Sequence, residues 1–324
     1  MTILITGANR GLGYGTALAL AADTTQMLAL VGRDLPNLKK RAGQIQAATG
    51  NANLIPMQLD LADLSSVRDF VGEYQARKLP PLKVLICNAG ISFSTGQRRS
   101  TDGYEETFAV NHLGHFLLVN LLIEALEPPA RVLMVSSAAH DPGLRKRGPM
   151  AGPRYVKAEW LAYPERDPNL PEDDSVVVGQ AYATSKLCNL LFTYELSRRL
   201  EASGLSTPMS PITVNAFAPG LVAGTGLGRD GGLPIRMVWY CLLPAVSRLM
   251  GFGRSARQAG ADLAYLAVAP ELEGVTRKYF FHREMRRSSE ESYDLHKAAN
   301  LWETSVQLTR LRPHENPLLA GSSS

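Results

Sequence analysis

The sequence has few of the features that mark a disulfide-stabilised, zinc-binding or nucleic-acid-binding protein. Only three of its 324 residues are cysteines, and Cys87, Cys188 and Cys241 form neither a C-x-x-C pair nor a spacing suited to zinc. This scarcity favours a reducing compartment. The 34 Lys and Arg residues exceed the 30 Asp and Glu residues by four, so the net charge of +4 is too small and too scattered to predict a nucleic-acid surface.

Targeting signals and long apolar stretches are also lacking. A strand is expected from the second residue onward, which leaves no room for the charged and apolar segments of a signal peptide. The most apolar later stretch, 237–250, is interrupted by Pro244 and Arg248 and is too short to span a bilayer. We therefore predict a cytoplasmic protein without a transmembrane segment.

The most informative stretch is Thr6-Gly7-Ala8-Asn9-Arg10-Gly11-Leu12-Gly13, which lies between an apolar run and a helix-favouring run. A strand, a tight glycine turn and a helix N-terminus direct several backbone N–H groups and the positive end of a helix dipole at one anion. The spacing differs from the usual G-x-G-x-x-G. With a strand before it and a helix after it, the turn predicts a pyrophosphate site rather than a plain glycine-rich turn.

Apolar runs alternate with helical patterns along the chain, as in βαβ units. Seven such runs predict a Rossmann-type, doubly wound α/β fold, with a seven-stranded parallel sheet and helices on both faces. The expected strands are 2–6, 27–31, 53–59, 83–88, 131–136, 212–217 and 278–281. We see no internal repeat and no linker, so a single domain is expected over 1–311, followed by a flexible tail over 312–324.

The end of the second expected strand carries Arg33 and Asp34. Dinucleotide-binding folds place a ribose-reading residue there, about 20 residues after the glycine turn. Asp34 could accept from the 2′-hydroxyl of NAD, whereas Arg33 could clamp the 2′-phosphate of NADP. Arg10 adds a second guanidinium that a bare ribose would not use. We therefore predict NADP(H), with Asp34 as the cap of the next helix.

The Thr-Gly-x-x-x-Gly-x-Gly turn resembles that of the short-chain dehydrogenase/reductase family. Four further matches follow in the family's order: Asn88-Ala89-Gly90, Asn111, Ser137 and Tyr182-x-x-x-Lys186. The resemblance implies that Asn111, Ser137, Tyr182 and Lys186 are catalytic. Tyr182 would protonate the substrate, Ser137 would hydrogen-bond the developing charge, Lys186 would tune Tyr182 and hold the ribose, and Asn111 would hold a water that relays protons to Lys186.

Tyr182 and Lys186 are four residues apart, so they should share one helix face. An ammonium about 5 Å from a phenol, at an effective dielectric of about 20, is worth roughly 3 kcal/mol. This predicts a Tyr182 pKa of about 8 instead of about 10, which makes Tyr182 a usable general acid. His112 and His115 have no Asp, Glu or Cys spaced to complete a metal site, so no metal is expected.

The resemblance also implies a set of cofactor contacts. Asp60, which follows the third strand, would lie beside the adenine, although it could instead be a helix cap. Thr225 is a weaker candidate near the nicotinamide amide. The expected cofactor-binding residues are Gly7, Asn9, Arg10, Gly11, Leu12, Gly13, Arg33, Asp60, Leu61, Asn88, Ala89, Gly90, Tyr182, Lys186, Pro219, Gly220 and Thr225.

Two segments distinguish this chain. An insertion over 138–181 is long for a loop and contains six prolines, and its aromatic residues Tyr155, Trp160 and Tyr163 would either cap a core edge or line a pocket. The resemblance places a mobile substrate lid at 221–254. The apolar stretch within this lid predicts a bulky hydrophobic substrate, although it could also contact a membrane surface.

The segments 111–116 and 185–189 and the tail with Trp302-Glu303 resemble the branch that contains retinol dehydrogenases and light-dependent protochlorophyllide reductases. The resemblance implies hydride transfer between NADP(H) and a carbonyl or alcohol. Reduction of a ring C=C bond is an alternative, and a non-catalytic NADP-binding sensor or scaffold is a third. Family members pair through the helices that hold Asn111 and Tyr182, so either a monomer or a homodimer is expected.

Overall fold

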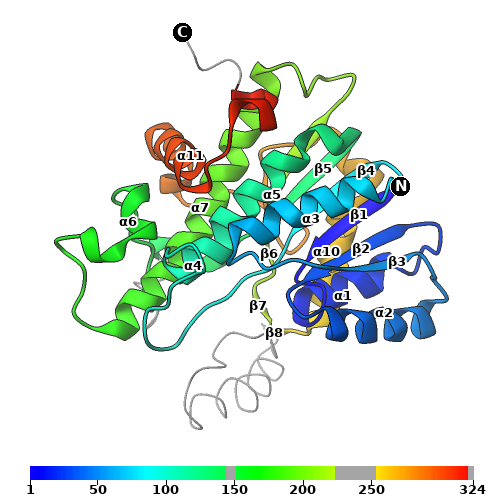
Figure 1. The fold of residues 1–324 in the computed structure, drawn as a ribbon, viewed down its shortest axis with the longest axis horizontal. Coiled ribbons are helices and arrows are strands. Elements are labelled where there is room, and N and C mark those ends of the chain that lie inside the picture. The colour runs from blue at the N-terminus through cyan, green and yellow to red at the C-terminus, as the bar shows by residue number, and fades with distance from the viewer. Residues whose placement is uncertain (144–150, 223–252, 320–324) are drawn as a thin grey trace.

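The computed structural model describes residues 1–143, 151–222 and 253–319 (Figure 1). Its centre is a mostly parallel sheet with the strand order β10-β9-β6-β5-β4-β1-β2-β3. The strands are β1 (Thr2–Thr6), β2 (Met27–Gly32), β3 (Leu54–Gln58), β4 (Leu82–Cys87), β5 (Leu126–Val135), β6 (Ile212–Ala218), β9 (Tyr279–Phe281) and β10 (Glu284–Arg286). All seven predicted parallel strands are present, which confirms the Rossmann-type fold.

The structure adds an eighth strand that the sequence did not predict. β10 pairs antiparallel with β9 at the edge of the sheet. Its three residues are all exposed and contain no apolar run, which explains why no hydrophobic pattern signalled it. A separate pair of short parallel strands, β7 (Leu221–Val222) and β8 (Gly253–Arg254), lies outside the main sheet.

Helices cover both faces of the sheet. They are α1 (Gly11–Leu20), α2 (Leu35–Thr49), α3 (Leu64–Ala76), α4 (Glu106–Phe108), α5 (Gly114–Leu122), α6 (Ala158–Ala162), α7 (Asp174–Ala202), α10 (Ala256–Val268) and α11 (Leu295–Thr309). Side chains alternate between faces along each strand. Thus Ile3 and Ile5 pack in the core with α1, α2 and α10, whereas Leu4 packs in the core with α3, α5 and α7.

The strand order reverses at β1, which lies between β2 and β4. In open α/β sheets, ligands bind outside the carboxyl ends of the strands at such a switch point. The glycine turn follows β1, and Asn88-Ala89-Gly90 follows β4. The topology therefore brings these two predicted cofactor motifs to the same edge of the sheet.

Part of the predicted insertion belongs to the long helix α7. This helix begins at Asp174, where Asp173 caps it by accepting from the backbone N–H of Ser175. Residues 174–181, expected in the insertion, therefore form the first turns of the helix that carries Tyr182. Both interpretations of the aromatic residues hold: Tyr155 packs into a core edge, and Trp160 lines a pocket.

The end of the chain is packed more tightly than predicted. Leu318 and Leu319 are buried in the core that also contains Trp302 of α11. The predicted flexible tail is therefore wrong for 312–319. α11 packs on α7 and α6 (Figure 1), so the chain's own elements cover much of the helix that carries Tyr182.

Within the described ranges, one continuous helical segment, Glu106–Ala125, is long and apolar enough to cross a membrane. Its apolar window is 83% buried inside the protein. This burial is typical of a core helix, and the segment packs against α3 and α7.

The backbones of helices α1 and α10 are in direct contact. A Cβ added to Gly15 would lie 2.3 Å from the carbonyl oxygen of Ala256, and one added to Gly260 would lie 2.3 Å from the carbonyl carbon of Gly15. Such distances leave no room for even a methyl group. The two glycines therefore let α10 cover the helix that follows the glycine turn.

Replacing Gly15 with alanine should separate α1 from α10. We expect Gly15→Ala to lower the free energy of unfolding by about 1–3 kcal/mol, as overpacking of cores does. Gly43→Ala is the matched control, because a Cβ at this position of α2 meets nothing within 4 Å. It should stabilise the protein by about 0.5–1 kcal/mol through helix propensity. Equal urea midpoints for the two variants would contradict this packing.

Candidate active site

The glycine turn has the geometry of an anion cradle. Gly7 and Gly11 have φ of +69° and +54°, in the left-handed region that favours glycine. A Cβ on Gly13 would lie 2.4 Å from the carbonyl oxygen of Gly7. Among the described residues, no side chain caps the first N–H groups of α1. These groups and the helix dipole are therefore available to a negatively charged ligand.

Thr6 ties the glycine turn to the end of β4. Its Oγ1 accepts from the backbone N–H groups of Asn88 (2.9 Å) and Ala89 (3.0 Å). The side-chain Nδ2 of Asn88 returns a bond to the Thr6 carbonyl at 2.7 Å. Sequence analysis missed this role of Thr6. The only available signal was that a β-branched hydroxyl residue, not an apolar one, ends the first strand.

The two histidines that were weighed as metal ligands are structural. His115 Nε2 lies 2.9 Å from Thr6 Oγ1, and His112 Nε2 lies 3.0 Å from Ser305 Oγ. Burial lowers the pKa of His115 to about 4 and that of His112 to about 3, so both rings are neutral at pH 7. In the part of the chain that the structure describes, no three His, Cys, Asp or Glu side chains cluster as metal ligands.

Asn111 lies in a π-helical turn, Ala109–Leu113, between α4 and α5. Its Nδ2 donates to the Ile91 carbonyl and to Ser185 Oγ, both at 2.9 Å, and its Oδ1 accepts from the Ile91 N–H at 2.8 Å. These bonds explain why a poor helix former lies in mid-helix. Irregular turns of this kind often mark functional sites.

The other three predicted catalytic residues meet at the ends of β4 and β5. Ser137 lies close enough to Tyr182 to lower the pKa of its phenol. Lys186 Nζ donates to the Val135 carbonyl at 3.1 Å and lies 5.7 Å from the centre of the Tyr182 ring. A Cβ on Gly90 would lie 3.3 Å from Lys186 Nζ and 3.2 Å from Asn111 Oδ1. Gly90 therefore lets the backbone lie against both side chains.

The electrostatics differ from the sequence expectation. Burial raises the pKa of Tyr182, and the nearby Ser137 only partly offsets this. Burial also lowers the pKa of Lys186 to about 8. The predicted Tyr182 pKa of about 8 is therefore wrong for this structure. The Lys186 ammonium lies 5.7 Å from the centre of the Tyr182 ring. The cost of desolvating the phenolate outweighs the attraction between this ammonium and the phenolate.

A supporting layer of polar residues holds Ser137 and Lys186. Ser136 Oγ donates to the Lys186 carbonyl at 2.7 Å. His140 Nδ1 donates to the Ser137 carbonyl at 2.6 Å, and its Nε2 accepts from the Ser289 N–H at 3.1 Å. Sequence analysis did not single out His140, because only the fold brings the segment around Ser289 to it.

The predicted ribose-reading region has three arginines rather than two. Arg33 is exposed just after β2, and Arg10 is the N-cap residue that precedes α1. Asp34 caps α2 by accepting from the Asn37 N–H at 3.0 Å, which confirms the expected cap. Arg41 of α2 was missed: its Nε donates to the Asn9 carbonyl at 3.0 Å, which ties α2 to the glycine turn. Its position two turns after Asp34 was the available signal.

The remaining cofactor candidates lie at neighbouring strand ends. Asp60 Oδ1 accepts from the Ala62 N–H at 3.0 Å, and Asp63, not Asp60, caps α3. Leu61 is buried beneath Gly114, whose added Cβ would lie 2.5 Å from the Leu61 carbonyl.

Pro219 and Gly220 follow β6. Gly220 has φ of +70°, and its added Cβ would lie 2.6 Å from His282 Nε2. Thr225 lies outside the described residues. So does the predicted lid, apart from 221–222 and 253–254, which form β7 and β8.

Comparison with known proteins agrees with this geometry. The family model for short chain dehydrogenases matches residues 1–147, and that for the AcuH dehydrogenase domain matches 233–315. Retinol dehydrogenase 13 of Homo sapiens is 35% identical over 322 residues, which cover 98% of this chain and 88% of that protein. The chain belongs to the short-chain dehydrogenase/reductase family. It is therefore an oxidoreductase by family.

Two other proteins extend the similarity within the short-chain dehydrogenase/reductase family. The WW domain-containing oxidoreductase of Danio rerio is 36% identical over 312 residues, which cover 96% of this chain and 68% of that protein. A crystal structure of an uncharacterized protein from Mycobacterium paratuberculosis is 31% identical with a TM-score of 0.67, and the match covers 95% of this chain and 93% of that one.

The buried ammonium of Lys186 should give stability a characteristic pH dependence. The unfolded chain keeps this proton to about pH 10.4, whereas the folded protein releases it near pH 8. Below pH 8 both states are protonated, and the full cost of burying the charge is present. Between these two values the unfolded state binds more protons, so the free energy of unfolding rises with pH.

Urea unfolding of wild type and Lys186→Met from pH 7.5 to 10.5 measures this effect. Relative to the variant, wild type should gain up to about 3 kcal/mol across the window. Parallel pH profiles for the two proteins would show that Lys186 is not a buried ammonium.

Proposed function

We propose that the protein is an NADPH-dependent oxidoreductase that interconverts a carbonyl and an alcohol on a bulky hydrophobic molecule. The observation that carries this proposal is the meeting of Asn111, Ser137, Tyr182 and Lys186 beside the glycine turn, at the carboxyl ends of the central strands. Substrates of open α/β enzymes bind at this edge.

The residues present fit a dinucleotide. The uncapped start of α1 and the turn from Gly7 to Gly13 would hold the pyrophosphate, and Gly90 would let the backbone lie close to the cofactor. Arg10 and Arg33 would bind the 2′-phosphate, while Arg41 would keep the turn in place. When bound, the nicotinamide would supply or accept the hydride.

The protein's own residues would handle the proton. Because burial raises the pKa of Tyr182, the phenol keeps its proton at neutral pH and can donate it to a carbonyl oxygen. Ser137, which lies near Tyr182, would donate to the same oxygen as negative charge develops. A protonated resting state favours reduction.

Asn111 would act behind Lys186. Both of its amide hydrogens and one acceptor position of Oδ1 are already used by Ile91 and Ser185. One acceptor position therefore remains for the relay water expected there. The supply of protons to Tyr182 would therefore depend on Lys186 and on the groups around its ammonium.

The substrate class rests on two arguments. Two relatives that are 35% and 36% identical to this chain are named retinol dehydrogenase 13 and retinol dehydrogenase 14. Retinol is a bulky hydrophobic alcohol. The apolar stretch 237–250 supports the same class.

Ring C=C reduction, a sensor or scaffold role and a cytoplasmic location stay predictions. For the oligomeric state we favour a monomer, because α11 packs over α7.

Removing the phenolic hydroxyl tests the catalytic proposal. Tyr182→Phe should lower kcat with NADPH and a retinal-like aldehyde by about 10³-fold, the scale of a lost general acid, while the Kd for NADPH stays unchanged. Tyr265→Phe is the matched control, since the Tyr265 hydroxyl bonds only to Glu271 among the described residues. Full turnover by Tyr182→Phe would contradict the mechanism. Tight NADPH binding without turnover of any substrate by wild type would favour the sensor.

Arginine substitutions test cofactor choice. Because a charge-assisted bond to phosphate is worth about 1.5–3 kcal/mol, Arg33→Ser should raise the KM for NADPH by roughly 10- to 100-fold. The KM for NADH should change little. Arg77→Ser, which removes an exposed arginine paired with Glu73 on α3, should alter neither value. Equal losses with both cofactors would show that Arg33 does not read the 2′-phosphate.

A further inference from the structure

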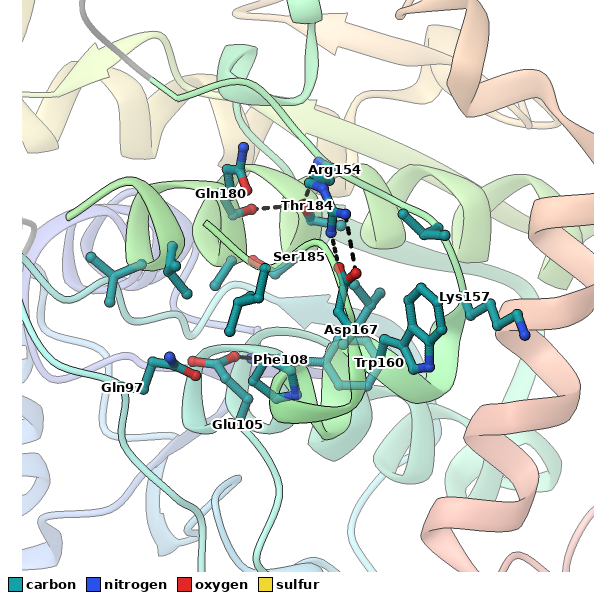
Figure 2. A pocket seen from close by; sticks show the side chains of 17 residues that line it. Gln97, Glu105, Phe108, Arg154, Lys157, Trp160, Asp167, Gln180, Thr184 and Ser185 are labelled. Atoms are coloured by element: carbon teal, nitrogen blue, oxygen red, sulfur yellow. Dashed lines mark hydrogen bonds and ion pairs between the residues drawn. The ribbon is translucent and has the colours of Figure 1, made fainter. Parts of the chain in front are cut away.

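A pocket open to solvent lies between α7 and the insertion (Figure 2). About 60 Å³ of its space can hold the centre of a water molecule. Although all four predicted catalytic residues are described, none of them lines it. The pocket faces the side of α7 that carries Val177, Ala181 and Thr184, which lie roughly 100° or more around the helix from Tyr182. It is therefore distinct from the reaction site.

The body of the pocket is apolar. Besides the α7 residues, it is lined by Phe108 of α4 and by Trp160, Leu161 and Leu170 from the insertion. The two basic residues of the lining are already engaged. Arg154 forms a two-pronged ion pair with Asp167 (Figure 2), and the Lys157 ammonium lies 5.1 Å from the centre of the Trp160 ring.

One charge of the pocket remains without a cationic partner. Glu105 is only 4% exposed, and its carboxylate accepts from the backbone N–H groups of Thr107 (3.0 Å) and Phe108 (2.7 Å). Within the described ranges, no Lys, Arg or His pairs with it. Each carboxylate oxygen has spare lone pairs, so a donor placed in the pocket would satisfy an acid that burial otherwise disfavours.

A second polar side chain lies at the same end. Gln97 lines the pocket, and an antiparallel bridge between Arg99 and Glu105 holds its segment beside Glu105. The amide of Gln97 can donate or accept. The end of the pocket at Gln97 and Glu105 is therefore acidic and rich in acceptors. Elsewhere the apolar and aromatic lining is interrupted by the Arg154–Asp167 ion pair and by Thr184 and Ser185.

We propose that this pocket binds a small amphipathic molecule whose apolar body lies among Phe108, Trp160 and Val178 and whose hydroxyl or amine donates to Glu105. The occupant contacts α7, the helix that carries Tyr182, on a side of the helix other than the one that carries Tyr182 and Lys186. Ser185 lines the pocket and accepts from Asn111, and Thr184 lines it and accepts from the backbone N–H of Arg154.

Three eight-carbon probes with different head groups test this site: octylamine, octan-1-ol and octanoate. Quenching of Trp160 fluorescence reports binding, with Trp160→Phe as the blank. Octylamine and octanol should bind at least fivefold more tightly than octanoate, because their head groups can donate to the Glu105 carboxyl oxygens and octanoate has no hydrogen to donate. Glu105→Gln should reduce the preference for octylamine over octanoate to less than twofold. Val268→Ala, an exposed site on α10, is the neutral control.

A second variant tests whether the probes need the space inside the pocket, rather than the charge of Glu105. Ala181→Phe places a ring into the pocket and should weaken all three probes at least fivefold. Circular dichroism and urea unfolding verify that both variants fold. Tyr182→Phe should bind the probes like wild type, so this test is independent of the proposed reaction. Equal affinity for octylamine and octanoate in wild type, or unchanged binding in Ala181→Phe, would overturn the proposal.

Discussion

The close approach of two backbone turns underlies the whole candidate site. The turn after β1 and the turn after β4 touch because Gly7 and Gly13 have no side chains, and Thr6 and Asn88 bond across the gap. Any larger residue at Gly13 would separate them. Their contact brings the anion cradle next to Gly90, and thus next to Asn111 and Lys186.

Desolvation sets the chemistry at this contact. Tyr182 and Lys186 are both pushed toward their neutral forms, the phenol by a raised pKa and the ammonium by a lowered one. Among the described residues, Lys186 Nζ donates to a backbone carbonyl, that of Val135, and not to a carboxylate. In such an environment a nearby phosphate or developing alkoxide would shift the pKa values of Tyr182 and Lys186 strongly, because nearby charges are weakly screened.

Helix α7 connects the two sites of the protein. One side carries Tyr182 and Lys186, and another side lines the pocket beneath the insertion. Asn111 and Ser185 join the two sides through a single hydrogen bond. The insertion and α11 therefore do more than lengthen the chain. The insertion encloses one face of α7, α11 packs on the same helix, and Gln97 and Glu105, from the segment before α4, form the acidic end of the pocket.

The sequence by itself determined the seven parallel strands, the glycine turn and the order of the four predicted catalytic residues. These features depend on local patterns: short apolar runs that alternate with helical patterns, glycine spacing, and a Tyr and a Lys one helical turn apart. The Asp34 cap was predictable for the same reason.

Only the tertiary structure decided the rest. Arg41, His140 and Thr6 act through partners far along the chain, so no local pattern signals them. The raised pKa of Tyr182 depends on how deeply the fold buries it, and spacing to Lys186 does not report burial. Likewise, Glu105 has no local mark of function. It becomes a buried acid in a pocket because the insertion, α4 and α7 meet around it.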